Sequence, residues 1–424
     1  MQYLSILKNI IKEKKAYIVG GFIRDYLLNK KINDIDIILM SDIDKIVNKF
    51  KNTTNTKMII LDEKRKIYRV IVDKNLFVDF SNPVGQDLKE DLGYRDFTIN
   101  SMAIDINDVK KGNKSYLLHK DNIIDPFNGK KDIDNKIIRM VDKAFVRNDP
   151  IRILRAYRFA NDLDFSLETK TMKIINKNEK LLYKVKNERI KDELLLMFSK
   201  ILNKQRVKEF LKSDLLYILF NINTYKKEIN RNEYLTSLNY ILEKSIFSII
   251  NIKKYMYNII ILFLAPILYD DITLNELNNT LIKYTFNKKD TQIIIEYLFF
   301  FKAIIKNSEK YLDNKRSIYQ DFYHLNINLK DMKSVINTYY TSKENKEKRE
   351  IALNILNQLQ IMKNNTKEKF LDGNEIKKLL NVKEGEIVGK ILKDVELQKA
   401  LGKLKNKNET IKHIKNKFKR INND

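Results

Sequence analysis

The sequence predicts an α+β protein, in which a small mixed sheet with helices is followed by a long all-helical remainder. Two observations predict this division of the 424-residue chain. Short runs rich in β-branched residues, each of strand length and bounded by polar or turn residues, are confined to about the first 140 residues. Between Gly129 and Gly373 there is no glycine, and helical periodicity continues throughout, which is typical of a helical body.

Six runs are expected to form the strands of the N-terminal sheet. They are AYIVGG, DIDIILM, TKMIIL, IYRVIV, NLFVDF and SMAIDI. Near the other end, Asp372-Gly373 and Gly385 are helix-cap signals. We expect four parts: a head at 1–140, a helical neck at 141–200, a helical body at 201–365 and a basic helical tail at 366–424.

The composition limits the chemistry and the partners. The chain has no cysteine, which excludes disulfides, thiolate metal sites and cysteine nucleophiles and fits a reducing, cytoplasmic setting. The most apolar run, Asn258–Tyr269, is shorter than the ~20 residues that a membrane helix needs, so we expect a buried helix and no membrane contact. The net charge of +26 suggests a polyanionic partner, although lysines spread along the whole chain are also typical of a solvated surface.

Two aspartates on the second predicted strand suggest a metal site. In NDIDIIL, Asp34 and Asp36 alternate with isoleucines, so both carboxylates lie on one face of the strand. Adjacent carboxylates repel unless a cation lies between them, and Mg²⁺ commonly binds through one or two carboxylates plus substrate phosphates. Asp79, in NLFVDF, could supply a third acid. The alternative is a solvated strand face.

A glycine pair precedes these aspartates. Gly20-Gly21 follows the apolar run AYIV and precedes the helical pattern FIRDYLL. A strand, a glycine turn and a helix start present free backbone N–H groups to a phosphate. Arg24, one helical turn further on, is expected to contact the same phosphate, with Asp25 orienting it. The alternative is a tight turn without a ligand.

A third pattern, NDPIRILRAYRFANDLDFSL, predicts a helix rich in arginine. Asp149 is expected to cap this helix, with Pro150 at its first position. Arg152, Arg155 and Arg158 recur every three residues and therefore lie along one side. Either they pair with acids elsewhere on the surface, or their guanidinium groups bind a triphosphate or a base.

Taken together, the motifs resemble a known family. GGFIRD with DID, YRDFTINSMA, DPFNG, NDPIRILRAYRF and NERIKDELLLMF occur in this order within roughly the first 200 residues. They resemble the class II tRNA nucleotidyltransferases, which are the CCA-adding enzymes and their bacterial poly(A) polymerase relatives in the polymerase β superfamily. The segment 370–415 resembles the C-terminal segment of that family.

The resemblance implies a fold and an activity. It implies a polymerase β-like nucleotidyltransferase head, a neck that carries the nucleotide-recognition helix, and a tail that binds tRNA. The implied reaction is template-independent, Mg²⁺-dependent addition of CCA, or part of it, to tRNA 3′ ends from CTP and ATP. The partners would be the tRNA acceptor end and the two nucleotides, and the oligomeric state, monomer or homodimer, stays open.

The resemblance also implies roles for individual residues. Asp34 and Asp36 match the metal-binding pair, and Asp79 is the candidate third catalytic carboxylate. The remaining positions match nucleotide-binding residues: Gly20, Gly21, Arg24 and Arg95 for the nucleotide, Asp149 and Arg152 for the base, and Arg155 and Arg158 for further contacts.

Two departures from the family pattern leave alternatives open. Asn148 stands where the base-reading motif usually begins with Glu. Only FSNPVGQDLKEDLGY separates Asp79 from Arg95, which leaves room for an enzyme that adds CC only or the terminal A only. Further alternatives are a poly(A) polymerase and a catalytically silent RNA-binding protein, although the arginine-rich signature of the polymerases is not visible in LDEKRKIYRVIV.

Overall fold

A computed structural model shows that the chain forms two compact units, Met1–Leu219 and Phe220–Asp424. The structure describes residues 2–12, 14–32, 34–73, 76–111, 116–141, 148–199, 288–342, 345–382 and 385–418, together with 205, 206, 209, 210, 213, 215–219 and 279. The predicted division into head, neck, body and tail stays a prediction.

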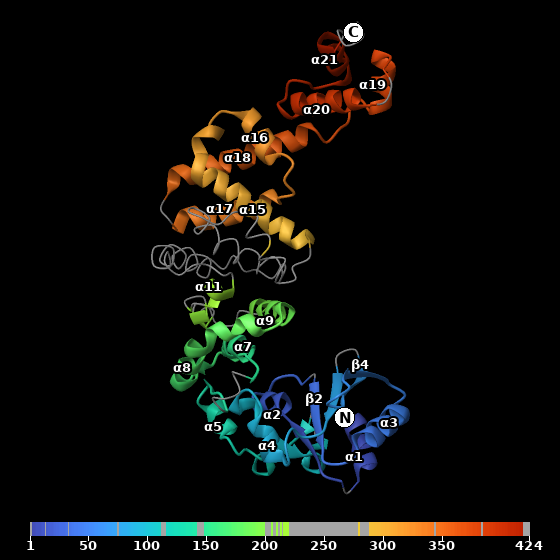
Figure 1. The fold of residues 1–424 in the computed structure, drawn as a ribbon, viewed down its shortest axis with the longest axis vertical. Coiled ribbons are helices and arrows are strands. Elements are labelled where there is room, and N and C mark those ends of the chain that lie inside the picture. The colour runs from blue at the N-terminus through green and yellow to red at the C-terminus, as the bar shows by residue number, and fades with distance from the viewer. Residues whose placement is uncertain are drawn as a thin grey trace. The chain divides into compact units, whose positions relative to one another are not determined.

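The first unit is built on a six-stranded mixed sheet (Figure 1). Its spatial order is β3-β4-β5-β2-β1-β6, and all neighbours are antiparallel except β2 and β5. The strands are β1 (Ala16–Val19), β2 (Asp34–Leu39), β3 (Lys57–Asp62), β4 (Ile67–Asp73), β5 (Leu76–Ser81) and β6 (Ala103–Asp105). Each of the six predicted runs therefore contributes one strand, and the predicted α+β class is confirmed.

The two faces of this sheet are covered differently. Ile35 and Ile37 are buried and, with Leu4 and Phe50, line the space between the sheet and two helices, α1 (Gln2–Ile11) and α3 (Ile43–Thr54). The opposite face carries Asp34, which is exposed, and Asp36, which is half-buried. On that face α4 (Leu88–Gly93) covers the ends of β1 and β2 through one hydrophobic cluster: Val19, Ile38, Leu92 and Ala103.

Short elements and a set of helices complete the first unit. The short helices are α2 (Gly21–Leu27) and α5 (Gly129–Asp134), and the short strands are β7 (Lys110–Lys111), β8 (Tyr116–Leu117), β9 (Ile137–Ile138) and β10 (Ser166–Leu167). After the sheet the chain forms the helices α7 (Arg152–Leu163), α8 (Thr169–Asn178), α9 (Asn187–Ser199) and α11 (Leu215–Leu219). Helices α7 and α9 pack against each other.

One part of the all-helical prediction is wrong. The β10 strand follows α7 inside the predicted neck and pairs in parallel with β9 of the predicted head, so one strand of this two-stranded ladder lies in the segment expected to be helical. Each strand has only two residues. Runs this short carry no periodic pattern, because a period of two needs about four residues to be visible.

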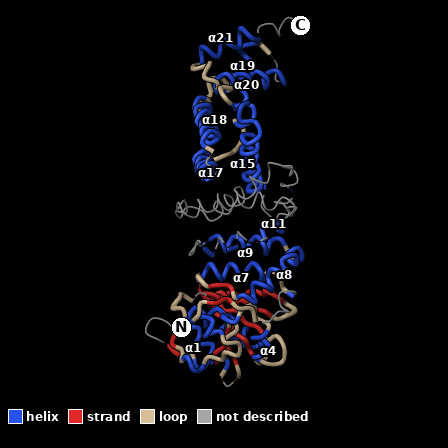
Figure 2. Tube along the Cα trace, turned by 90° about the vertical axis from the view of Figure 1, so that its left-hand side faces the viewer, coloured by secondary structure: helices blue, strands red, loops and turns tan. Residues whose placement is uncertain are grey.

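The described part of the second unit is helical. It contains α15 (Lys288–Asn307), α16 (Lys315–Phe322), α17 (Leu329–Ser342), α18 (Lys346–Asn365), α19 (Gly373–Leu380), α20 (Glu386–Ala400) and α21 (Lys407–Phe418). In Figure 2 the strands gather in the first unit, and the described residues of the second are helices and loops. Helix α18 packs against α16, α17 and α20.

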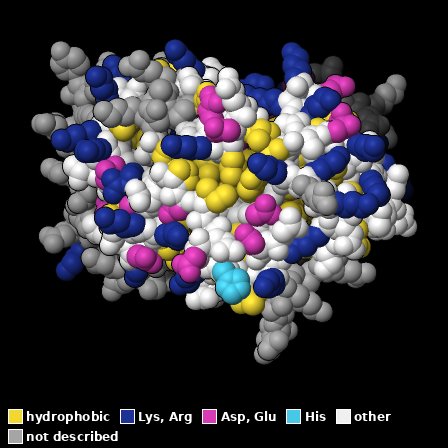
Figure 3. All heavy atoms as spheres, turned by 90° about the horizontal axis from the view of Figure 1, so that it is seen from below, with side chains coloured by type: hydrophobic (Ala, Val, Ile, Leu, Met, Phe, Trp, Pro, Cys, Tyr) yellow, Lys and Arg dark blue, Asp and Glu magenta, His cyan; other side chains and the backbone are white. Residues whose placement is uncertain are grey.

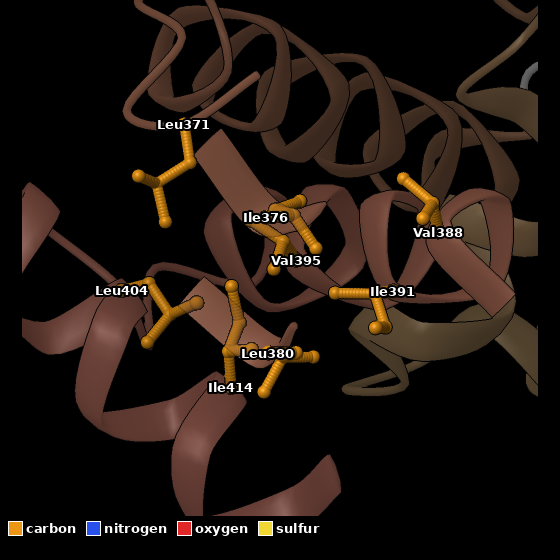
Figure 4. Close-up of a cluster of buried hydrophobic side chains, with 8 residues drawn as sticks. All are labelled: Leu371, Ile376, Leu380, Val388, Ile391, Val395, Leu404 and Ile414. Atoms are coloured by element: carbon orange, nitrogen blue, oxygen red, sulfur yellow. The ribbon is translucent and has the colours of Figure 1, made fainter. Parts of the chain in front are cut away.

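The last three helices share a hydrophobic core of their own (Figure 4). The members are Leu371, Ile376, Leu380, Val388, Ile391, Val395, Leu404 and Ile414. Both predicted helix caps are confirmed here, and each lies at the start of a helix. Asp372 and Glu375 form a capping box before α19, in which each side chain accepts the other residue's backbone N–H at 2.8 Å, and Gly385 directly precedes α20.

Two predictions concern the surface. None of the described helices has the length and apolar character needed to cross a bilayer, and the run Asn258–Tyr269 lies outside the described residues. On the face shown in Figure 3, Lys and Arg side chains are interspersed with Asp and Glu. That face therefore has the mixed charges of a solvated surface rather than a single basic patch.

Candidate active site

The predicted alternation on β2 is confirmed. In the sheet, Asp36 lies opposite Val19 of β1 on one side and Asp79 of β5 on the other. Burial raises the pKa of Asp36, Arg95 opposes this shift, and the carboxylates of Asp79 and Asp34 add to it. Burial also raises the pKa of Asp34. The ionised pair is therefore unfavourable unless a cation lies near it.

The glycine turn lies against this pair. Gly20 has φ +74°, in the left-handed region that favours glycine. A Cβ at Gly20 would lie 2.8 Å from Nη1 of Arg95 and 3.4 Å from Oδ2 of Asp36. The turn thus brings the main chain, a guanidinium and a carboxylate into contact, and only glycine fits between them.

Arg24 lies beside the same turn. Its Nε and Nη2 each donate to the Asp25 carboxylate at 2.9 Å, which confirms that Asp25 orients it. Its Nη1 donates to Oδ1 of Asn100 at 2.7 Å. A Cβ at Gly21 would lie 3.3 Å from Nη2 of Arg24. The guanidinium is therefore fixed over the turn by two partners, of which Asn100 was not predicted.

Asp79, the candidate third acid, already forms an ion pair with Arg69. Nε and Nη2 of Arg69 on β4 donate to the two carboxylate oxygens of Asp79 at 2.8 and 2.7 Å. This pair couples β4 to β5 beside Asp36, and sequence reasoning missed it. The sequence does not specify that IYRVIV pairs with NLFVDF, and without that pairing nothing indicates that Arg69 and Asp79 are neighbours. The role of Asp79 as a third metal ligand stays a prediction.

Two of the neck arginines pair with acids. Nε and Nη2 of Arg155 donate to Oδ2 of Asp96 at 2.9 and 2.6 Å. Glu193 on α9 accepts from Arg155 at 3.5 Å and from Arg158 at 2.6 Å. For these two arginines the structure thus has the first of the two predicted arrangements, pairing with acids. Their predicted nucleotide contacts stay predictions.

A buried hydrogen-bond chain joins the head motif to the neck helix. Asn100 accepts from Arg24 and donates through Nδ2 to Oδ1 of Asp96 at 3.0 Å, and Asp96 accepts from Arg155. Burial opposes the ionisation of Asp96, but the Arg155 guanidinium and these hydrogen bonds hold its pKa below the usual range. The Cζ atoms of Arg24, Arg155 and Arg158 also lie 5.2, 5.3 and 4.3 Å from the Phe159 ring centroid.

The start of the neck helix corrects one prediction. Asp149 does not cap α7, whose N-cap is Ile151. The carboxylate of Asp149 instead accepts from Nη1 and Nη2 of Arg189 at 2.9 and 3.0 Å. The backbone carbonyl of Asp149 accepts from the N–H of Arg152 at 3.2 Å, so main-chain bonds already satisfy this end of the helix.

Arg152 lies against the segment that carries Arg95. Its Nη2 donates to the Tyr94 carbonyl at 2.7 Å and its Nη1 to the Arg95 carbonyl at 3.3 Å. Burial lowers the pKa of Arg152. A residue predicted to read the base and a residue predicted to bind the nucleotide are thus directly connected, although their roles stay predictions.

The DPFNG motif stabilises the backbone next to the segment that carries Asn100. The two carboxylate oxygens of Asp125 accept from the N–H groups of Gly129 and Lys130 at 2.7 and 2.9 Å. A Cβ at Gly129 would lie 2.3 Å from the carbonyl oxygen of Thr98. This close contact fixes the turn that leads to Asn100, so the role of the motif is to hold the backbone in place.

The donors present fit a divalent cation that shares its ligands with a substrate. Asp34 and Asp36 offer hard oxygen ligands on one face, which suits Mg²⁺, an ion that usually keeps waters and substrate phosphates in its shell. Within the described ranges, no group of three or more His, Cys, Asp or Glu side chains could hold a metal ion.

Comparison with known proteins identifies the head. Residues 16–139 match the family described as Poly A polymerase head domain. This part of the chain is similar to that family. The chain is also 36% identical over 207 residues to the CCA-adding enzyme of Lactobacillus johnsonii, and 34% identical over 183 residues to the CC-adding tRNA nucleotidyltransferase of Geobacter sulfurreducens. These matches cover 46% and 43% of this chain and 49% and 40% of the relatives, so the chain matches about half of their length or less.

The fold beyond the head is also that of known structures. The chain is similar to the Thermotoga maritima CCA-adding enzyme complexed with tRNA, with a TM-score of 0.66, 20% identity and coverage of 98% of this chain and 94% of that one. For a CCA-adding enzyme complexed with CTP, the TM-score is 0.69, the identity 21% and the coverage 98% and 93%. The predicted family resemblance is confirmed, and nucleotidyltransferases of this family generally use a divalent metal.

Proposed function

We propose that the chain is a template-independent tRNA nucleotidyltransferase, which adds CCA or part of it to tRNA 3′ ends from CTP and ATP. The observation that carries this proposal is the contact between the acid pair and the glycine turn. A Cβ on Gly20 would lie 3.4 Å from Oδ2 of Asp36 and 2.8 Å from Nη1 of Arg95, so the carboxylate proposed to bind the metal and the cation proposed to bind phosphate lie at one point. Nucleotidyl transfer needs both groups at the same phosphate.

The relatives support the same reaction. The similar proteins are named CCA-adding or CC-adding enzymes, and the solved structures of similar fold contain tRNA, CTP or ATP. Because the sequence matches span about half of the relatives' length or less, the substrates and partners of this chain are part of the proposal.

In the proposed reaction the 3′ hydroxyl oxygen of the tRNA bonds to the α-phosphorus of the nucleotide. The bond from that phosphorus to the pyrophosphate oxygen breaks, and the hydroxyl proton passes to solvent. Asp34 and Asp36 would hold Mg²⁺, which when bound makes the hydroxyl more acidic and neutralises the charge that develops. No covalent enzyme intermediate is needed, which agrees with a chain without cysteine.

The other residues of the site would position the nucleotide. The Gly20-Gly21 turn with Arg24 and Arg95 would take the triphosphate, and guanidinium groups suit this role because they give paired hydrogen bonds to phosphate oxygens. Arg152 and Asp149 would read the base edge, which in C and in A presents an amino donor beside a ring acceptor. Arg155 and Arg158 would make further nucleotide contacts after leaving their present acidic partners.

The basic second unit would hold the tRNA. Helices α20 and α21 carry exposed lysines such as Lys390, Lys393 and Lys415, and phosphate contacts of this kind recognise RNA by shape. Such contacts weaken as salt rises. The cytoplasmic location and the choice between monomer and homodimer stay predictions, which fractionation of cells and light scattering would test.

An extension assay tests the proposed function. The full chain is incubated with Mg²⁺, a tRNA transcript lacking its CCA end, and CTP, ATP, UTP or GTP, singly and together. We expect addition of C and A only, with extension that stops after three residues or fewer. Extension that continues as a run of A would identify a poly(A) polymerase instead. RNA binding without any extension would identify the silent RNA-binding protein.

One observation favours the partial activity as a second candidate. The connection between β5 and Arg95 is short and is held by hydrogen bonds within it. Asp91 accepts from the Val84 N–H at 2.9 Å, and Glu90 accepts from the Gln86 N–H at 2.8 Å. One similar protein is a CC-adding enzyme. Extension that stops after two C residues, with ATP present, would establish this candidate.

A further inference from the structure

Beyond the acid pair, the same face of the sheet continues across β5, β4 and β3. Residues that pair across neighbouring strands point to the same side of a sheet, so the strand register defines which side chains share this face. Two rows run from the acids toward the edge of the sheet: Asp36, Asp79, Arg69 and Ile59 in one, and Asp34, Phe77, Ile71 and Lys57 in the other.

On β4 and β5 these side chains stay partly accessible, whereas the central side chains on the reverse of the same two strands are buried, and on β3 both faces are exposed. Phe77, Ile71 and Arg69 are half-buried, and Ile59 is 40% exposed. On the reverse face Val70, Val78 and Phe80 are buried. An aromatic and two aliphatic side chains left open beside a charged site are unusual for a solvated surface and point to a ligand with an apolar face.

The order of the strands indicates from which side the attacking hydroxyl would reach the α-phosphorus. The proposed triphosphate turn, Gly20-Gly21, follows β1, which lies on one side of β2, while β5, β4 and β3 lie on the other side. In phosphoryl transfer the attacking and leaving oxygens lie roughly in line on opposite sides of the phosphorus. The leaving pyrophosphate would lie toward β1, so the attacking hydroxyl would come from the side of β5.

The charges on this half of the face suit an RNA end. Cζ of Arg69 lies 5.3 Å from the centroid of the Phe77 ring, and Lys57 is exposed in the same row as Phe77. Aromatic rings and guanidinium planes stack on unpaired bases, and lysines contact the phosphates. The pair of Arg69 with Asp79 fixes the guanidinium beside the ring.

We propose that this half-face, formed by Phe77, Ile71, Ile59, Arg69 and Lys57, seats the last nucleotide of the RNA 3′ end whose hydroxyl attacks. The proposal rests on the proposed function and adds a binding site for the second substrate. The base stacks on Phe77 and extends over Ile71 and Ile59. Arg69 and Lys57 contact its phosphate, so the hydroxyl is held on the side of Asp36 that faces away from the glycine turn.

Photochemical crosslinking tests the seat independently of activity. The probe is a hairpin of the tRNA acceptor and T arms that lacks CCA and ends in 5-iodouridine, a base that crosslinks to aromatic rings stacked on it. With the full wild-type chain, we expect the adduct on Phe77 in the peptide that contains β5. Adducts found only in the neck or in the second unit would overturn the proposal, even if CTP addition is intact.

Kinetics with one variant test the same seat in the reaction. Phe77→Leu removes the ring and keeps most of the apolar volume, so the KM for the hairpin should rise roughly tenfold while the KM for CTP stays unchanged. Phe77→Trp should restore the hairpin KM. An unchanged hairpin KM in Phe77→Leu, or a rise in the CTP KM alone, contradicts the proposal. Wild-type protein that crosslinks at Phe77 but adds no nucleotide would refute the proposed function and leave the RNA seat standing.

Two neighbouring residues of β3, Ile59 and Ile60, provide a matched control. They also test the proposal if Phe77→Leu folds poorly. Ile59 and Ile60 are 40% and 53% exposed but point to opposite faces of β3, because Ile59 pairs with Arg69 and Ile60 with Tyr68. Ile59→Ala should raise the hairpin KM severalfold, and Ile60→Ala should leave it unchanged. Equal KM values in the two variants contradict the proposal.

Discussion

Asp36 on β2 lies directly opposite Asp79 on β5, in the parallel pair of an otherwise antiparallel sheet. Both carboxylate oxygens of Asp79 accept hydrogen bonds from Arg69, whereas Asp36 is influenced by Arg95 and, more weakly, by Arg69. The uncompensated charge is therefore concentrated on the β2 pair. This difference separates the acid that couples two strands from the acids that are available to a metal.

Replacing Asp36 with Asn should stabilise the metal-free protein. Burial raises the pKa of Asp36 in the folded state above its unfolded value, so its ionisation costs stability as the pH rises through the folded pKa. The Tm of Asp36→Asn should exceed that of the wild type at pH 7.5, and the gap should narrow as the pH falls toward 4. Calorimetry in EDTA measures the Tm of the wild type and of the variant at each pH. A lower Tm in the variant at pH 7.5 would contradict this expectation.

The conformation of Gly20 should make it irreplaceable. Gly20→Ala forces a Cβ into left-handed backbone and onto Arg95, so we expect a loss of about 1–2 kcal/mol in the free energy of unfolding and a loss of nucleotide addition. Gly389→Ala is the matched control, since Gly389 lies inside α20 with open space around it. That change should add about 0.5–1 kcal/mol. Equal denaturation midpoints for the two variants would refute this reading of Gly20.

The buried pair of Asp96 and Arg155 should dominate the stability of the head–neck connection. Asp96→Asn leaves the Arg155 guanidinium with the longer contact to Glu193 as its remaining ion pair, so unfolding should become easier by about 3–5 kcal/mol. The folded-state pKa of Asp96 is lowered, so its contribution is present above the unfolded pKa and is lost as the pH falls through the folded pKa. The variant should therefore lose less stability on acidification.

Urea titrations at several pH values measure the free energy of unfolding of the wild type and of Asp96→Asn. Asp134→Asn, at an exposed aspartate on α5, is the control and should change the unfolding free energy by no more than about 0.5 kcal/mol. Similar losses in both variants would show that Asp96 has no special role.

Arg152 should control nucleotide choice more than turnover. Its guanidinium lies against the Tyr94 and Arg95 carbonyls at the start of α7, where the base is proposed to lie. Arg152→Ala should reduce the ratio of correct to incorrect nucleotide addition by roughly tenfold, which corresponds to the loss of about one good hydrogen bond to a charged group. Single-nucleotide kinetics with CTP, ATP and UTP measure the ratio. Lys173→Ala on α8 is the control, and an unchanged ratio in Arg152→Ala would refute the base-reading role.

Local pattern is enough to predict most of the head. The six strands follow from β-branched runs of strand length, and the alternation at Asp34 and Asp36 is enough to place both carboxylates on one face of β2. The capping box at Asp372 and Glu375 is partly visible for the same reason. Such features depend on residues a few positions apart, so the sequence is enough to identify them.

Contacts between distant residues could not be predicted in this way. Arg155 meets Asp96 and Glu193 across 59 and 38 positions, and Arg69 meets Asp79 through a strand register that the sequence does not specify. The cap predicted at Asp149 was wrong because Arg189, 40 residues away, binds its carboxylate. Long-range pairing thus decides which charged side chains remain available to a ligand.

The central claim is that the acid pair performs nucleotidyl transfer while other surfaces hold the RNA. The direct measurement compares wild type with Asp36→Ala, using tRNA lacking CCA, CTP and Mg²⁺, with RNA affinity measured in parallel by filter binding. We predict that transfer falls by at least about a hundredfold, while the Kd for RNA stays within about threefold because phosphate contacts dominate binding. Transfer that persists in Asp36→Ala at a rate close to wild type would contradict the claim.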